Sequence, residues 1–317
     1  MNTKVGVALI NWNGGEFTIP CIESLLQGTR QPDIIVVIDN ASIDASPTTI
    51  SDTFPQVSLI CNQYNAGFAG GNNQAIEFLL SNGCNYIWIL NNDTTVDRDC
   101  LATLLETAQR YPAAAGFSGK IYYDNPPDRL WYAGAARHPI HKAPKHFSTD
   151  IMDRQAVGGA VPVDFLSGCC MLVPGWAFQK AGGFINAYVA YSEDSEWCWR
   201  VTKLGLKLYY VPLACLWHRL SASIKKNATH NHTTSLPPLA IYLMGRNHLW
   251  TVRKHVDGRL FRTFCVLVNA GIQLRNCAVN LLRGNVRVAW AYIRGLMSGL
   301  FGVLPIDIPH FPDSEKV

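Results

Sequence analysis

Short clusters of acid and amide side chains follow three apolar segments in the N-terminal third of the chain. The clusters are Asn11-Trp12-Asn13, Asp39-Asn40 and Asn91-Asn92-Asp93. A single polar residue after such a segment often caps the next helix, but three clusters with two aspartates favour a ligand site. Carboxylates can also hold a divalent cation. We therefore predict one binding crevice that is lined from three strands.

The elements that would position these clusters alternate between strand and helix patterns. Apolar runs of strand length cover 5–12, 33–39, 57–61 and 86–90, and helical patterns lie between them. Continuous apolar strands separated by amphipathic helices indicate a parallel sheet with helices on both faces. Ligands bind beyond the carboxyl ends of the strands in such sheets, and the three clusters stand at those ends.

A second set of residues that could do chemistry lies further along the chain. Glu193-Asp194 opens a predicted helix over 193–204, a strand is predicted over 206–211, and Leu216-Trp217-His218 ends the regular core. Acids are favoured at a helix N-terminus by the helix dipole whatever else they do. The pair alone therefore leaves a structural and a catalytic interpretation open. Glu196 is expected on the solvated face of the same helix.

A glycine-rich loop over 65–73 contains Gly67, Gly70 and Gly71 just before a helical pattern. Such a loop lets backbone amides approach a nucleotide closely, beside a helix N-terminus that favours anions. It lacks the Gly-Lys-Ser/Thr sequence of the Walker motif. We interpret it as a weak indication of a nucleotide site.

Composition excludes several classes of protein. The chain has 317 residues, of which 48% are hydrophobic and 16% charged, and this balance excludes a disordered protein. Ten cysteines occur without CxxC pairs or zinc-site spacing, which favours reduced thiols in a cytosolic protein. No uninterrupted apolar run is long enough to span a membrane, so a simple membrane span is not expected.

Charge is distributed unevenly along the chain. Residues 1–240 carry 17 Lys+Arg and 19 Asp+Glu, whereas residues 241–317 carry 10 and 4. In the second part the basic residues alternate with aliphatic and aromatic residues at helical spacing, which suits helices at an anionic membrane interface. A helical cap on the soluble domain and an oligomer interface are the alternatives. A nucleic-acid binder is disfavoured because the cations do not cluster on a polar face.

Eight sequence motifs occur in an order and at a spacing typical of one enzyme family. They are VALINWNGG (7–15), VVIDNASIDAS (36–46), NAGFAGGNNQAI (65–76), LNNDTTVD (90–97), KIYYDNPPDRLWYAGA (120–135), VDFLSGCCMLV (163–173), YSEDSEWCWRVTKLGLKLYYVPLACLWH (191–218) and YLMGRNHLWTVRKH (242–255). With them the chain resembles family 2 glycosyltransferases of the GT-A fold, in the bacterial rhamnosyltransferase-like subgroup. The resemblance implies an α/β catalytic domain with a Rossmann-like mixed sheet over 1–238. Residues 239–317 would then form a C-terminal segment of basic amphipathic helices.

The resemblance also implies an activity. It is inverting transfer of a sugar from a dTDP- or UDP-sugar, such as dTDP-rhamnose, to a glycan or polyprenyl-diphosphate-linked acceptor in surface polysaccharide synthesis. Asp194 would be the base that takes the acceptor proton, and Glu193 would position it. Asp93 and His218 would hold Mn²⁺ or Mg²⁺. Such enzymes carry a DxD-like motif where this chain has Asn91-Asn92-Asp93, so one acid remains, and an imidazole ligand suits Mn²⁺ better than Mg²⁺.

The remaining roles follow from the same resemblance. The residues expected to contact the nucleotide-sugar are Asn11, Asp39, Asn40, Gly67, Gly71, Asn72, Asn92 and Asp93. On the acceptor side we expect Trp131 as a stacking face and Gly168 as a point of close approach, and Arg246 could face the diphosphate. The expected location is cytoplasmic, at the inner face of the membrane. The alternative function is a non-catalytic nucleotide or carbohydrate binder, or an assembly protein, with the same fold.

Overall fold

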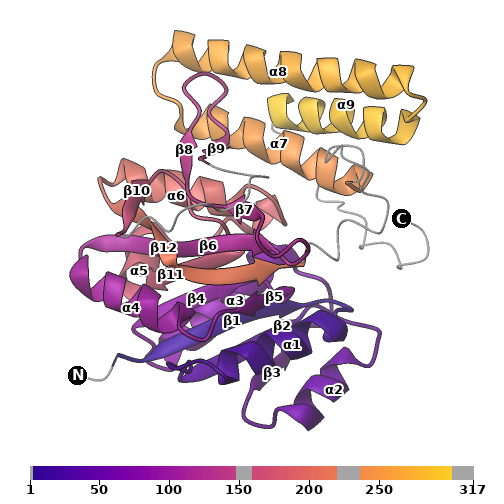
Figure 1. Ribbon diagram of the computed structural model, residues 1–317. Helices are drawn as coiled ribbons and strands as arrows, with labels where there is room; N and C mark the ends of the chain where they lie inside the picture. Colours follow the sequence, from indigo (N-terminus) through magenta and orange to yellow (C-terminus); the bar gives the residue numbers. More distant parts are fainter. Residues whose placement is uncertain (1–2, 148–158, 220–235, 302–317) are drawn as a thin grey trace.

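The computed structural model describes residues 3–147, 159–219 and 236–301. Within these ranges ten strands form one mixed sheet with helices against it, and three C-terminal helices form a further layer (Figure 1). The first elements are β1 (Val5–Asn11), α1 (Gly15–Leu26), β2 (Ile34–Asp39), α2 (Ser46–Thr53), β3 (Ser58–Cys61), α3 (Gly67–Ser81), β4 (Tyr86–Leu90), β5 (Thr94–Val96) and α4 (Cys100–Arg110). They are followed by β6 (Ala114–Tyr123), β7 (Leu130–Tyr132), β8 (Ala135–Arg137), β9 (Pro144–His146), β10 (Val161–Val163), β11 (Cys170–Pro174), α5 (Gly175–Ala181), the 3₁₀ turn η1 (Asn186–Tyr188), α6 (Glu193–Lys203), β12 (Lys207–His218), α7 (Pro238–His255), α8 (Arg259–Leu282) and α9 (Val286–Phe301).

The first half of the sheet is parallel, as predicted. Its strand order is β3-β2-β1-β4, and all three pairings are parallel. The register places Asn11 directly opposite Asp39, the last residue of β2. The predicted strands over 5–12, 33–39, 57–61 and 86–90 are confirmed to within one residue at each end. Their carboxyl ends therefore meet at one edge of the sheet.

The second half departs from the parallel arrangement that the strand patterns predicted. β11 lies between β4 and β6 and is antiparallel to both, with Cys170 opposite Leu90. Consequently the beginning of β11 lies at the edge where β4 ends. β12 is also longer than the predicted strand over 206–211, because it continues parallel to β6 through an irregular register between Val211 and Cys215. The extension carries His218 to a position opposite Thr94.

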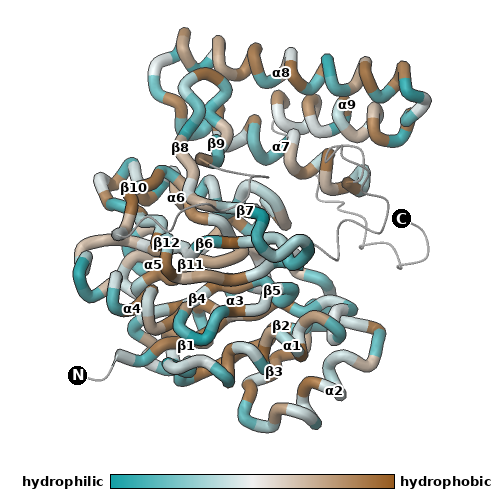
Figure 2. The backbone as a smooth tube through the Cα atoms, in the orientation of Figure 1, coloured by the Kyte–Doolittle hydropathy of each residue, from teal (hydrophilic) through white to brown (hydrophobic). Residues whose placement is uncertain are grey.

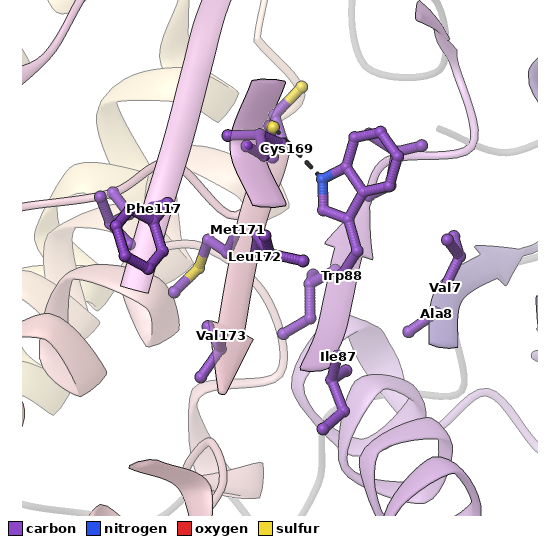
Figure 3. Packing of buried hydrophobic residues seen from close by; sticks show 14 of the residues in the cluster. Val7, Ala8, Ile87, Trp88, Phe117, Cys169, Met171, Leu172 and Val173 are labelled. Carbon is purple, nitrogen blue, oxygen red and sulfur yellow. Dashed lines mark hydrogen bonds between the residues drawn. The ribbon is translucent and has the colours of Figure 1, made fainter. Parts of the chain in front are cut away.

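The centre of the sheet is closely packed (Figure 3). The Trp88 indole on β4 is fully buried and donates a hydrogen bond to the Cys170 sulfur at 3.4 Å. Leu172 on β11 and Phe117 on β6 lie in the same buried cluster. Because these side chains are buried against one another, the ends of β4 and β11 are fixed by packing as well as by backbone pairing.

The C-terminal helices are α7, α8 and α9, and hydropathy alternates along them, whereas the central strands are mainly hydrophobic (Figure 2). The sequence predicts basic amphipathic helices over 239–317. The structure confirms them through Phe301, with a break at Gly284-Asn285, and the last predicted positions lie outside the described residues. α9 packs tightly on α7 because it has glycines there. A Cβ at Gly295 would lie 2.8 Å from the Tyr242 carbonyl oxygen.

α8 is one continuous helix of 24 residues. By length and composition alone it could cross a membrane. Of its most apolar window, 28% is buried inside the protein. A simple membrane span is not expected from the sequence, because no uninterrupted apolar run is long enough. The helix reaches spanning length because single arginines separate its apolar runs but do not end the helix.

Candidate active site

The three polar clusters at the strand ends are joined by hydrogen bonds. The Asn11 amide donates to Asp39 Oδ1 at 2.7 Å and to Ser46 Oγ at 2.8 Å. On its other side, Asn11 Oδ1 accepts a hydrogen bond from Thr18 Oγ1 at 2.7 Å, and the Asn92 amide donates to the same hydroxyl at 2.8 Å. The structure therefore brings the ends of β1, β2 and β4 together, as the sequence predicted.

Asp39 is directed into this network. Its side chain is 2% exposed, and its oxygens accept hydrogen bonds from the Ser42 amide at 2.9 Å and the Ser42 hydroxyl at 2.6 Å. Asn40 is equally buried and donates to the Gly67 carbonyl oxygen at 3.1 Å. In this state both residues hold the loops that surround the crevice, and their contact with a nucleotide stays a prediction.

The glycines of the 65–73 loop allow α3 to pack closely. Gly67 has φ of +72°, and a Cβ there would lie 2.6 Å from the Val189 carbonyl oxygen. At Gly71 a Cβ would lie 3.0 Å from an Ile10 methyl group. Asn72 is fully buried, and its side-chain oxygen is one of the buried acceptors without a hydrogen-bond partner among the described residues. In the structure these glycines serve the packing of the protein. The approach of a nucleotide to them stays a prediction.

The two residues predicted to bind a metal ion lie side by side. His218 Nε2 is 3.0 Å from Asp93 Oδ1 and 3.3 Å from the Asn91 amide nitrogen. Trp131 stands edge-on to the imidazole, with 4.8 Å between the ring centroids. The described residues contain no group of three or more His, Cys, Asp or Glu side chains that could hold a metal.

The donor atoms at this place nevertheless fit a divalent cation. The side chains of His218 and Asp93 are both largely buried, at 6% and 12% exposed, and His218 Nδ1 has no hydrogen-bond partner among the described residues. One carboxylate and one imidazole are ligands that suit Mn²⁺ better than Mg²⁺. Two protein ligands leave the other coordination positions to a diphosphate and water.

Asp194 occupies the N-terminus of α6, where backbone amides hold both of its oxygens. Oδ2 accepts a hydrogen bond from the Gly168 amide at 2.8 Å, and Oδ1 accepts one from the Ser195 amide at 2.6 Å. The carboxylate therefore has a fixed direction and receives the positive end of the helix dipole. It lines a cavity of about 390 Å³ that Trp131 and Met244 also line. In the structure the Gly168 amide therefore holds the Asp194 carboxylate in place.

Glu193 differs from its neighbour in environment. It is 5% exposed, and its Oε2 is without a hydrogen-bond partner among the described residues. Burial raises the pKa of the Glu193 carboxyl well above its ordinary value, and the nearby Asp194 carboxylate raises it further. The buried carboxyl therefore favours its protonated form, and Asp194 is the group of the pair that is suited to accept a proton.

Glu196 is not on a solvated face, so that prediction was wrong. Its carboxylate is fully buried and is bound by Arg200 at 2.8 Å, His255 at 2.9 Å and Lys254 at 3.1 Å. Burial raises its pKa, but these partners outweigh burial and the pKa is lowered overall. The ion-pair cluster fastens α6 to the end of α7.

Arg246 was expected to face the diphosphate, and the structure corrects this expectation because the side chain is turned into the protein. The residue is 0% exposed, and its guanidinium donates to the carbonyl oxygens of Ala187 at 2.8 Å and Tyr188 at 3.2 Å. It also lies over the Trp250 ring, 4.4 Å from the centroid. The enclosed guanidinium therefore stabilises the backbone at Ala187 and Tyr188, shortly before Asp194. It cannot reach a ligand unless the side chain rearranges.

Asn247, which is not among the predicted site residues, completes this support. Its amide donates to the carbonyl oxygens of Tyr188, Ala190 and Tyr191 at 2.9, 2.9 and 2.7 Å. The segment that it holds is strained, since Val189, Tyr191 and Ser192 all have φ between 64° and 68°. The Arg-Asn pair in the last motif was the only signal in the sequence. We call residues 187–192 the α6 entry loop.

His146 is a second residue of the site that is not among the predicted ones. It lines the same cavity as Asp194, and its ring centroid is 6.4 Å from that of Trp131. Burial lowers the pKa of His146, while the Asp194 carboxylate opposes the effect.

The family model of glycosyl transferase family 2 matches residues 7–173, more than half of the chain. This chain belongs to glycosyl transferase family 2. The predicted family is therefore confirmed, and with it the prediction that the chain is a glycosyltransferase.

Two curated relatives of this family 2 glycosyltransferase are rhamnosyltransferases. N-acetylglucosaminyl-diphospho-decaprenol L-rhamnosyltransferase from Mycobacterium tuberculosis is 26% identical over 270 residues, which cover 79% of this chain and 87% of the relative. Rhamnosyltransferase WbbL from Escherichia coli is 26% identical over 160 residues, or 46% of this chain and 58% of that protein.

Solved structures resemble the chain in fold. The mannosyltransferase PcManGT from Pyrobaculum calidifontis, in complex with GDP-Man and Mn²⁺, has a TM-score of 0.57 at 12% identity and covers 96% of this chain and 88% of its own. S. aureus TarS 1–349 in complex with UDP-GlcNAc has a TM-score of 0.58 at 12% identity, with 94% and 81% covered. These likenesses confirm the predicted GT-A fold.

Proposed function

We propose that this family 2 enzyme transfers a sugar, with inversion, from a dTDP- or UDP-sugar to a lipid-linked glycan. One observation carries the proposal. Trp131 lines the cavity of Asp194 and also contacts His218 of the Asp93–His218 pair, so one indole ring links the proposed base to the two proposed metal ligands. The two rhamnosyltransferase relatives favour rhamnose as the sugar, and the name of the mycobacterial one favours a GlcNAc-diphosphate-lipid acceptor.

In the proposed reaction, the acceptor hydroxyl oxygen forms a bond to the anomeric carbon of the donor. The bond from that carbon to the nucleoside diphosphate breaks, and the diphosphate leaves with the electron pair. Asp194 accepts the hydroxyl proton, and its direction is fixed by the Gly168 and Ser195 amides. The raised pKa of Glu193 disfavours a second negative charge beside the base, which would lessen repulsion of the attacking hydroxyl oxygen.

Asp93 and His218 are the residues that would hold a divalent cation. The cation, Mn²⁺ in preference to Mg²⁺, would neutralise the negative charge of the departing diphosphate. Mn²⁺ accompanies a bound nucleotide-sugar in the PcManGT complex, which supports this choice for the fold. The backbone of the nearby strand ends would border the nucleotide.

We also propose the division of the chain into a catalytic part over 1–238 and a C-terminal part over 239–317. α7 would then be the connection between the parts, because Asn247 and the Glu196 cluster attach it to α6 and its entry loop. The expected location is the cytoplasmic face of the membrane, where a lipid-linked acceptor would be presented.

The test is transfer by the purified full chain. The donors are dTDP-rhamnose, UDP-GlcNAc and GDP-mannose, the acceptor is a short-chain GlcNAc-diphosphate-lipid analogue, and the product is measured by mass spectrometry with and without Mn²⁺. We expect transfer from a dTDP- or UDP-sugar in the presence of Mn²⁺ and loss of at least about 10²-fold in Asp194→Asn. Nucleotide binding without transfer or donor hydrolysis, or full activity in Asp194→Asn, would instead favour a non-catalytic binder.

A further inference from the structure

α8 has its polar side inside and its apolar side outside. The residues that it buries include Asn269, Gln273 and Asn280, at 5 to 7% exposed. Two of these amides bond inward, since Asn269 donates to the His141 carbonyl oxygen at 3.0 Å and Gln273 to the Gly245 carbonyl oxygen at 3.2 Å. A helix that packs on a soluble protein normally presents the opposite pattern.

The outer side of α8 carries a continuous apolar stripe. Leu260, Phe264, Leu267, Leu274 and Leu282 recur at spacings that place them on one side of a helix, and they are 48 to 89% exposed. α9 adds a second row, which consists of Val286, Trp290, Met297 and Phe301 at 49 to 67% exposed. We call these nine residues the outer stripe. So many large apolar side chains in water are unusual for a soluble protein and mark an interaction surface.

The charges around the outer stripe have one sign. α8 and α9 contain no Asp or Glu, and the arginines between 259 and 294 are Arg259, Arg262, Arg275, Arg283, Arg287 and Arg294. A second copy of the chain seated on this face would bring arginines against arginines. An anionic lipid surface would instead attract each nearby cation by about 1 kcal/mol.

A cavity beside the stripe has the same character. It measures about 820 Å³ and lies where α7, α8 and α9 approach one another. Trp250 and Leu267 give it apolar walls, and Arg253 and Arg262 give it positive charge. Apolar walls with cations suit the region where lipid head groups meet acyl chains.

We propose that the outer stripe is embedded in the head-group and upper acyl region of an anionic membrane, with α8 lying along the surface. α8 does not cross, because its buried amides hold it on the protein by bonds that a spanning helix would have to give up. Trp290 and the arginines mark the depth, since such side chains prefer the interface. This surface is independent of the sugar or acceptor that the enzyme uses.

The test is flotation of the full chain with vesicles of phosphatidylcholine, with and without phosphatidylglycerol. The double variant Phe264→Glu/Leu267→Glu changes two exposed side chains, and Leu213→Glu is the matched control at an exposed leucine of β12. We expect the wild-type chain and the control to float with phosphatidylglycerol vesicles, and the double variant to bind at least about tenfold more weakly. Circular dichroism should be the same in all three proteins.

Three results would overturn the proposal. The first is equal flotation of the double variant, and the second is resistance of the wild-type chain to alkaline extraction, which would indicate a spanning helix. The third is a wild-type dimer that does not float and that the double variant converts to a monomer, because a second copy would then cover the stripe. Donor hydrolysis or transfer to a water-soluble acceptor should be unchanged in the double variant, so loss of flotation and failure of the proposed reaction are distinguishable.

Discussion

Replacement of Asn247 by alanine should show whether the α6 entry loop positions the base Asp194 or only stabilises the fold. The Asn247 amide holds three carbonyl oxygens of the α6 entry loop. The Tyr188 carbonyl keeps Arg246 as a second donor at 3.2 Å, so the loss should fall mainly on the carbonyls of Ala190 and Tyr191. A buried carbonyl that loses its donor costs about 1–3 kcal/mol, so we expect the free energy of unfolding to fall by about 2–4 kcal/mol.

The effect on catalysis should be larger than a loss of stability explains. Val189, Tyr191 and Ser192 keep left-handed conformations that cost about 1–3 kcal/mol each, so the loop should relax once Asn247 is removed. Asp194 is two residues beyond Ser192 and should move with it. A displacement of about 1 Å at a reacting group can cost about 10²-fold in rate, so kcat should fall by this order.

The assay is steady-state transfer to a soluble acceptor at a temperature where the variant is folded, together with a urea titration. Asn280→Ala is the matched control, because Asn280 is buried to 6% exposure and donates only within α8, to the Asn276 carbonyl oxygen at 2.9 Å. It should lose stability and keep kcat. If Asn247→Ala also keeps its kcat, or raises only KM, the entry loop does not position the base and the reasoning fails.

Three further predictions concern the site. In Glu193→Gln the buried carboxyl is replaced by a neutral amide. The raised pKa of Glu193 makes the wild-type chain lose stability as pH rises above the unfolded value of about 4.3, so the variant should gain stability relative to the wild type over the same rise in pH. Urea titrations across that range measure this, and a difference that does not change with pH would contradict it. In His218→Ala the Mn²⁺ affinity in the presence of a nucleoside diphosphate should fall at least about tenfold by electron paramagnetic resonance, and unchanged affinity would remove His218 from the ligand set. Gly67→Ala should lower the free energy of unfolding by about 2–4 kcal/mol, because its Cβ would meet the Val189 carbonyl, whereas Gly83→Ala, which also has positive φ but open space, should cost only about 1 kcal/mol.

The strand patterns were sufficient to predict the parallel half of the sheet and the meeting of three polar clusters. Parallel strands place their carboxyl ends at one edge, so Asn11, Asp39 and Asn92 had to meet once the strands were identified. The pairing of Asp93 with His218 was inferred from the resemblance alone, because no local pattern joins residues so far apart in the sequence.

The errors have a common physical origin. Glu196 and Arg246 are charged, and charged side chains are almost always placed at the surface, but here each is buried among partners from other elements. In α8 the periodicity identified an amphipathic helix and could not tell which side faces the protein. Burial depends on tertiary neighbours, and a single sequence records these only indirectly.

The reversed direction of β11 has a consequence for how the enzyme can vary. β11 is hydrogen-bonded to β4 on one side and to β6 on the other, and the Cys169 carbonyl accepts the Asn91 amide at 3.2 Å. The place of Gly168, which holds Asp194, is therefore set by neighbouring backbone and not by the length of the connection that leads to it. Insertions and deletions in that connection can reshape the acceptor side of the cavity while the base keeps its support. The specificity for the acceptor can therefore change through this connection with little effect on the position of Asp194.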